Sequence, residues 1–333
     1  MLVVTLNSFR SQTSLQIQTC LQNLFCQIVF YQVENTVSYP VYSEATFSPF
    51  SSVSRKFPVL TFLWLNSRVK TVSEEIEIYR DRKWRREESL RVESAEDVEV
   101  MVEELGMCLG MTDERKRMPS VYIAVCGRRD AHMPRNVQKD FEASRAWVLK
   151  DEVVARGKVY YGKVYKGHSM FLAPRMIPVF NAIWGCSKKG EAGVLSKNSR
   201  AVLKVLRKEW EMATADLRSA TGLPRADLTK AVDELQRRMK VVPQEVVYIP
   251  KFTYIWTLAE ARFPKELSKK MKREDAVREL ARCYLEMCGM TLLGELSGKF
   301  GFYRWESGKA NHELVDEGYA ERVETGVYRL KEI

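Results

Sequence analysis

The hydrophobic positions in the C-terminal half of the chain repeat one order of elements twice. Residues 201–212 ("AVLKVLRKEWEM") and residues 276–287 ("AVRELARCYLEM") share the spacing of an amphipathic helix. Each is followed by a short turn, a second apolar-spaced segment, a third helical pattern and a Val/Tyr-rich tail that alternates in polarity. Helix, turn, helix, helix and two strands is the plan of a winged helix, so the repeat predicts two of them in tandem.

The third helix of each repeat is its most regular part. In the first repeat, over 224–240, the apolar positions recur at spacings of four, three and four, which puts them on the core-facing side: Leu228, Val232, Leu235 and Met239. The opposite side carries Arg225, Thr229, Lys230, Asp233 and Arg237. Two strands follow, with a turn near Pro250–Lys251. In the second repeat, 302–318 is the corresponding helix and 319–330 a hairpin turning at Thr325–Gly326.

Upstream of the repeats the pattern is less regular. We predict helices after Val72 and from Ser94, with Ser73 and Ser94 as N-caps. Residues 118–127 are either a strand or a short helix. Residues 159–165 and 169–173 form a hairpin that turns at 166–168, residues 175–185 a short helix, and residues 186–200 a Gly/Ser/Lys linker.

These elements predict an α+β fold that is mainly helical. The predicted domains are a helical and β-hairpin domain over 67–190, a winged helix over 191–262 and a second winged helix over 263–333. Residues 1–66 differ from the rest, because their only charged residues are Arg10, Glu34, Glu44, Arg55 and Lys56. We expect this segment to be a poorly ordered or misassigned extension.

The amino-acid composition limits which kinds of partner and binding site we expect. The formal net charge is +10 and the pI is near 9.2, which favours a polyanionic partner because cations that neutralise phosphates release counterions. Seven cysteines without CxxC spacing and three histidines argue against a structural zinc site and a disulfide framework. We therefore expect no metal and no cofactor. The absence of a long apolar run predicts a chain without a membrane span. We also expect the protein to be cytoplasmic and nucleoid-associated.

Two long stretches resemble a known superfamily. Residues 201–302 are similar to the winged-helix tandem of the AlkZ/YcaQ DNA glycosylases. Residues 94–185, with a glycine-cysteine helix end, a Trp-x-x-Lys-Asp-Glu turn in "RAWVLKDEVV" and the hairpin "GKVYYGK", resemble the AlkZ-related branch more closely. The resemblance covers about 69–330. It implies DNA binding and, for the glycosylases, metal-independent excision of alkylated or crosslinked bases.

The catalytic signature that the resemblance implies, Gln-x-Gln or Gln-x-Asp, has no convincing match. Gln16–Ile17–Gln18 fits the pattern, but it lies in a glutamine-rich segment outside the resembling region, so we reject it. If catalysis survives, a carboxylate must stabilise positive charge on the sugar, and Asp151 and Glu152 are the best pair. Trp147 could stack on an extruded base, and Lys150 or Arg156 could hold a phosphate. The structural alternative makes Trp147 a core residue and Lys150–Asp151 an exposed turn.

The candidates for DNA contact are cations on the third helices and their wings, because such helices meet base edges and wings meet phosphates. In the first repeat they are Arg225, Lys230, Arg237, Arg238, Lys240 and Lys251. In the second they are Arg304, Lys309 and His312, together with the uncharged Asn311. We therefore expect a winged-helix protein that binds double-stranded DNA in damage repair. An active monofunctional DNA glycosylase and a winged-helix scaffold for proteins are the alternatives.

Overall fold

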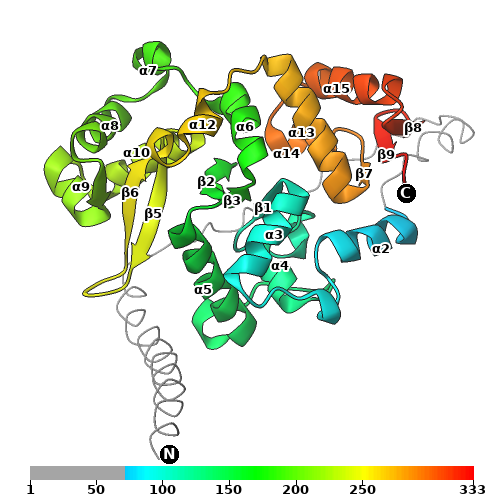
Figure 1. Cartoon of the computed structure of the whole chain (residues 1–333), viewed down its shortest axis with the longest axis horizontal. Helices are drawn as coiled ribbons and strands as arrows, with labels where there is room; N and C mark the ends of the chain where they lie inside the picture. The colour runs from blue at the N-terminus through cyan, green and yellow to red at the C-terminus, as the bar shows by residue number, and fades with distance from the viewer. Residues whose placement is uncertain (1–71) are drawn as a thin grey trace, which may run out of the picture. The chain divides into compact units, whose positions relative to one another are not determined.

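One order of elements, helix, strand, helix, helix and two strands, occurs three times in the computed structural model, which describes residues 72–333 (Figure 1). The first set is α3 (Ala95–Leu105), β1 (Met107–Leu109), α4 (Val121–Cys126), α5 (Phe141–Arg156), β2 (Tyr160–Tyr165) and β3 (His168–Leu172). The second is α8 (Lys197–Glu209), β4 (Glu211–Ala213), α9 (Thr214–Thr221), α10 (Arg225–Arg237), β5 (Val241–Val247) and β6 (Thr253–Leu258). The third is α13 (Arg273–Cys288), β7 (Met290–Thr291), α14 (Glu295–Phe300), α15 (Arg304–Asp316), β8 (Ala320–Glu324) and β9 (Val327–Leu330). The last two sets coincide with the repeats found in the sequence.

Each set closes into an antiparallel sheet of three strands in which the last strand lies in the middle. The strand orders are β1-β3-β2, β4-β6-β5 and β7-β9-β8. The described chain is therefore mainly helical with small antiparallel sheets, as the predicted α+β class requires. Between residues 72 and 333, no helix is both long and apolar enough to span a membrane.

The remaining helices connect these sets. They are α2 (Glu74–Lys83), α6 (Ile177–Trp184), α7 (Glu191–Val194), α11 (Ala259–Arg262) and α12 (Pro264–Ser268). The linker predicted over 186–200 is wrong in part, because α7 and the start of α8 lie in it. Ser196 caps α8 by accepting a hydrogen bond from the Ser199 amide at 3.2 Å, and Glu191 is fixed by an ion pair to Arg207 at 2.7 Å.

In the first set, two local predictions are corrected and one open alternative is decided. Residues 121–126 are helical and not a strand, since the Ser120 side chain caps α4 by accepting from the Ile123 amide at 3.1 Å. The segment expected as a turn around Lys150 lies inside α5, which Asp140 caps. His168 belongs to β3, and the hairpin turns at Lys166 and Gly167, whose φ angles of 43° and 81° suit a two-residue turn.

Two groups of buried side chains hold the described chain together. The first and third sets share one core that includes Leu105, Tyr160, Phe171, Leu280 and Tyr284. The second set has a core of its own, which includes Val202, Leu206, Leu217, Leu235 and Trp256. The described cysteines are free thiols, and Cys108, Cys126, Cys283 and Cys288 are buried.

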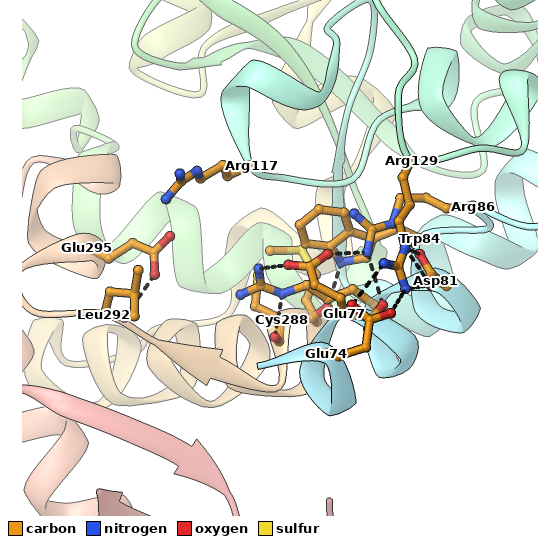
Figure 2. Close-up of polar contacts among 12 residues, drawn as sticks. Glu74, Glu77, Asp81, Trp84, Arg86, Arg117, Arg129, Cys288, Leu292 and Glu295 are labelled. Carbon is orange, nitrogen blue, oxygen red and sulfur yellow. Dashed lines mark hydrogen bonds and ion pairs between the residues drawn. The ribbon is translucent and has the colours of Figure 1, made fainter. Parts of the chain in front are cut away.

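The helix α2 is tied to the end of α13 by polar contacts. Figure 2 shows Trp84 and Cys288 at this junction. The Trp84 indole N–H donates to the Met287 carbonyl at 2.7 Å, and the Arg80 guanidinium donates to the Cys288 carbonyl at 2.8 Å. Arg129 adds an ion pair to Glu74 at 2.8 Å, also visible in Figure 2. Because these partners are helix-end carbonyls and neighbouring carboxylates, the cluster is structural.

Candidate nucleic-acid interface

A buried lysine surrounded by aromatic rings lies where the first and second sets meet. Lys150 of α5 is 1% exposed. Its ammonium lies 4.4 Å from the ring centre of Trp147, one turn earlier in α5, 5.8 Å from that of Tyr161 and 5.6 Å from that of Tyr254. Such rings attract a cation through their negative faces. The predicted Trp147–Lys150 pair is therefore joined by Tyr161 of β2 and Tyr254 of β6.

Hydrogen bonds fix the charge of this lysine. Its ammonium donates to a carboxylate oxygen of Asp151 and to the Tyr254 hydroxyl, the latter at 3.3 Å. The Tyr248 hydroxyl donates to the other Asp151 oxygen. Burial alone would lower the pKa of Lys150, but Tyr161, Tyr254 and Asp151 outweigh it and hold that pKa above its usual range. Lys150 is therefore charged, and the alternative of an exposed Lys150–Asp151 turn is wrong.

A cavity of about 240 Å³ opens beside the ring cluster. Its walls are Met111, Thr112, Trp147, Lys150, Tyr161, Gly167, His168, Ser169 and Tyr254. The Thr112 hydroxyl is buried and has no hydrogen-bond partner among the described residues. Burial, and then Lys116, lowers the pKa of His168, so its ring is neutral at pH 7. The cavity thus offers flat aromatic walls together with hydrogen-bond donors from Lys150 and Thr112.

The two predicted catalytic carboxylates do not converge on this cavity. Asp151 is 8% exposed, both of its oxygens are engaged, and it is not part of the cavity wall. Glu152 is exposed, and as the next residue of α5 it points about 100° away around the helix. The rejected pair Gln16–Ile17–Gln18 lies outside the described residues.

The predicted cations of α10 divide into two kinds. Arg225, Lys230 and Arg237 are exposed, as is Lys251 at the turn between β5 and β6. Arg238 instead donates to the Trp184 carbonyl at 3.2 Å. Four exposed cations on one helix and its hairpin remain for a polyanion.

Two other residues of this region are engaged within the protein. The ammonium of Lys240 pairs with Glu191 at 2.9 Å, and its side chain is 13% exposed. Asp233 pairs with Lys163 of β2 at 2.9 Å, so it packs α10 on the neighbouring hairpin. Its carboxylate is neutralised there.

The predicted DNA-contact residues of α15 also differ in exposure and in their contacts within the protein. Arg304 is exposed at the first position of the helix. Lys309 is exposed but pairs with Glu274 of α13 at 2.7 Å. His312 is exposed with its Nε2 3.4 Å from the Tyr328 hydroxyl, whereas Asn311 is buried. Arg304 is the predicted residue of this helix that is best placed for an external partner.

Sequence reasoning missed a second, larger cavity of about 520 Å³ between α6, α8, β6 and the loop after α12. Its cationic wall residues are Lys188, Arg207, Lys240, Lys269 and Lys270. The run "SKKMKR" over 268–273 was the sequence signal that could have found it. Tyr248, Tyr254 and Thr112 had no such signal.

Comparison with known proteins gives one family. A family model described as AlkZ related matches residues 92–297. No curated protein matches the sequence. Among solved structures, the Streptomyces sahachiroi DNA glycosylase AlkZ is similar with a TM-score of 0.48 and 13% identity, covering 76% of this chain and 70% of that one.

Proposed function

Because the chain belongs to the AlkZ-related family, we propose that it is a winged-helix protein that binds double-stranded DNA in damage repair. The third helix of each set is the recognition helix in this proposal, and the hairpin that follows is the wing. The proposal includes the three predicted domains, over residues 67–190, 191–262 and 263–333. We expect the protein to act at the nucleoid, without a metal or cofactor.

The observation that carries the proposal is the set of exposed cations on α10 and its hairpin. Arg225, Lys230, Arg237 and Lys251 are exposed, whereas the neighbouring Lys240 is used inside the protein. Exposed cations on a helix and the adjoining wing suit the phosphates on both sides of a groove. Affinity then comes mainly from counterion release and falls steeply with salt.

An active DNA glycosylase is the second candidate, and the aromatic cavity is the observation that favours it. Trp147, Tyr161 and Tyr254 offer stacking surfaces for an extruded base, and Lys150 can donate to an acceptor on it. Asp151 could activate water only if the Tyr248 hydroxyl moved off its carboxylate. Release of an alkylated base, lost in Asp151→Asn although the variant stays folded, would establish this activity.

Binding to a fluorescently labelled duplex tests the lead proposal. We expect Lys230→Ala and Arg237→Ala to weaken binding similarly for different DNA sequences, each reducing the slope of log K against log salt by about 1. Lys204→Ala is the matched control, because Lys204 is an exposed lysine on α8 of the same set. Unchanged affinity in both α10 variants would refute the interface, and no duplex binding at low salt would favour the protein scaffold instead.

A further inference from the structure

Two large aromatic side chains lie side by side on the surface at the start of α15. Tyr303 is 70% exposed and Trp305 is 64% exposed. Their ring centres are 6.4 Å apart and their planes differ by 11°. Arg304 lies between them in the sequence and is also exposed. Tyr and Trp side chains combine an apolar ring with a polar group and are enriched at binding interfaces.

The backbone that carries these rings is held in place. The preceding residue, Phe302, is buried and stacks on Trp184 with ring centres 5.7 Å apart. The Tyr303 amide donates to the Glu306 carboxylate at 3.0 Å. Because the segment is anchored before a partner arrives, little backbone entropy is lost when the rings bind one.

The basic run "SKKMKR", residues 268–273, lies next to Tyr303 and Trp305. Arg273, the first residue of α13, pairs with Glu306 at 2.8 Å, so one carboxylate joins the run to the Tyr303 backbone. The Lys309–Glu274 pair at 2.7 Å is a second connection between α15 and α13, which lie next to each other in Figure 1. The aromatic pair and the basic run are therefore parts of one surface.

The lysines of this run are available to an external anion. Lys269, Lys270 and Lys272 are exposed, and none of them makes an ion pair within residues 72–333. Lys269 and Lys270 also line the 520 Å³ cavity, whose other cationic wall residues, Lys188, Arg207 and Lys240, are paired with Glu260 and Glu191. The surface therefore extends from the two rings along the exposed lysines to the cavity that Lys269 and Lys270 line.

We propose that this surface binds an unpaired nucleic-acid strand, with bases stacked on Tyr303 and Trp305 and phosphates along Lys269–Lys272 into the basic cavity. A duplex hides the faces of its bases, whereas a single strand offers both faces and phosphates to aromatic and cationic side chains. The inference goes beyond the proposed duplex contact and rests on different residues from those of α10.

Anisotropy of the full chain with a labelled 20-mer of thymidylate tests the proposal. We expect Tyr303→Ala/Trp305→Ala to weaken single-strand binding by about tenfold or more, because stacking on each ring contributes to affinity. Trp210→Ala is the matched control, since Trp210 is also 64% exposed but lies at the end of α8. We expect less than a twofold change in that control.

Three outcomes would overturn the proposal: no binding of the wild-type chain to the 20-mer at low salt, equal loss in the Trp210 control, or no loss in the Tyr303/Trp305 variant. A uridylate 20-mer run in parallel distinguishes DNA from RNA as the source of the strand. Loss of duplex binding alone, after Lys230→Ala and Arg237→Ala, bears on the proposed function and not on this surface.

Discussion

Lys150 shows what the sequence could and could not predict about single residues. Trp147, Lys150 and Asp151 stand within five positions of one another, so their association was visible in the sequence. Their partners Tyr248 and Tyr254 come 97 and 104 positions later, and no spacing rule connects them to α5. The sequence therefore supplied the charged pair but not the rings and hydroxyls that allow its burial.

The buried Lys150–Asp151 pair leads to a prediction about stability. Asp151→Asn leaves the Lys150 ammonium buried without its counter-charge, and we expect it to lower the free energy of unfolding by about 3–5 kcal/mol. Lys150→Met/Asp151→Asn removes both charges and should recover most of that loss. Urea unfolding measures all three proteins. If the double variant were as unstable as the single one, the pairing would not be the cause.

Glu191 gives a prediction about pH. Burial would raise the pKa of this carboxyl, but hydrogen bonds from Arg207 and Lys240 outweigh burial and hold the pKa below its usual range. A group with a lowered pKa contributes stability above its unfolded pKa of about 4.3, and that contribution is lost as pH falls through the folded value.

We therefore expect Glu191→Gln to cost about 1.5–3 kcal/mol at pH 7 and much less at pH 3, by urea unfolding at both pH values. Glu260→Gln serves as the control, because Glu260 is 45% exposed and its pair with Lys188 is longer, at 3.4 Å. An equal cost of Glu191→Gln at the two pH values would contradict this account of the ion pair.

At the scale of elements, both predicted N-cap serines stand where their helices begin, but only one of them makes a capping hydrogen bond. Ser94 accepts from the Asp97 amide at 3.1 Å, and the Asp97 carboxylate accepts from the Ser94 amide at 2.9 Å, which completes a capping box. Ser73 occupies the same position before α2 but makes no side-chain cap hydrogen bond. The residue type alone does not reveal which rotamer the side chain adopts.

This difference makes the two serines a matched pair. We expect Ser94→Ala to lower the free energy of unfolding by about 1 kcal/mol, because it leaves an α3 amide unpaired. Ser73→Ala should change it by only a few tenths of a kcal/mol. Thermal unfolding of both variants compares them directly, and equal effects would count against the cap in α3.

The first set of elements was not recognised as a third copy of the repeated order, for physical reasons. Residues 127–140 separate α4 from α5, whereas α9 and α10 are joined by only three residues, 222–224. The similar amino-acid sequences of α8 and α13 revealed two copies, and the sequence of α3 does not share that similarity.

At the scale of the molecule, the shared core was beyond sequence reasoning. Amphipathic patterns predict which face of a helix is buried but not which helix covers it. The packing of α13 against α6 and α2 therefore came from the structure alone, as did the common core of the first and third sets. The basic cavity beside α12 depends on the same packing.

The salt dependence of duplex binding by the full chain tests the central claim most directly. If Arg225, Lys230, Arg237 and Lys251 contact phosphates, log K should fall linearly with log salt with a slope of about −3 to −4. A titration from 50 to 200 mM salt by fluorescence anisotropy measures this slope. A slope near zero, or no binding at 50 mM salt, would contradict a DNA-binding surface built on α10 and its hairpin.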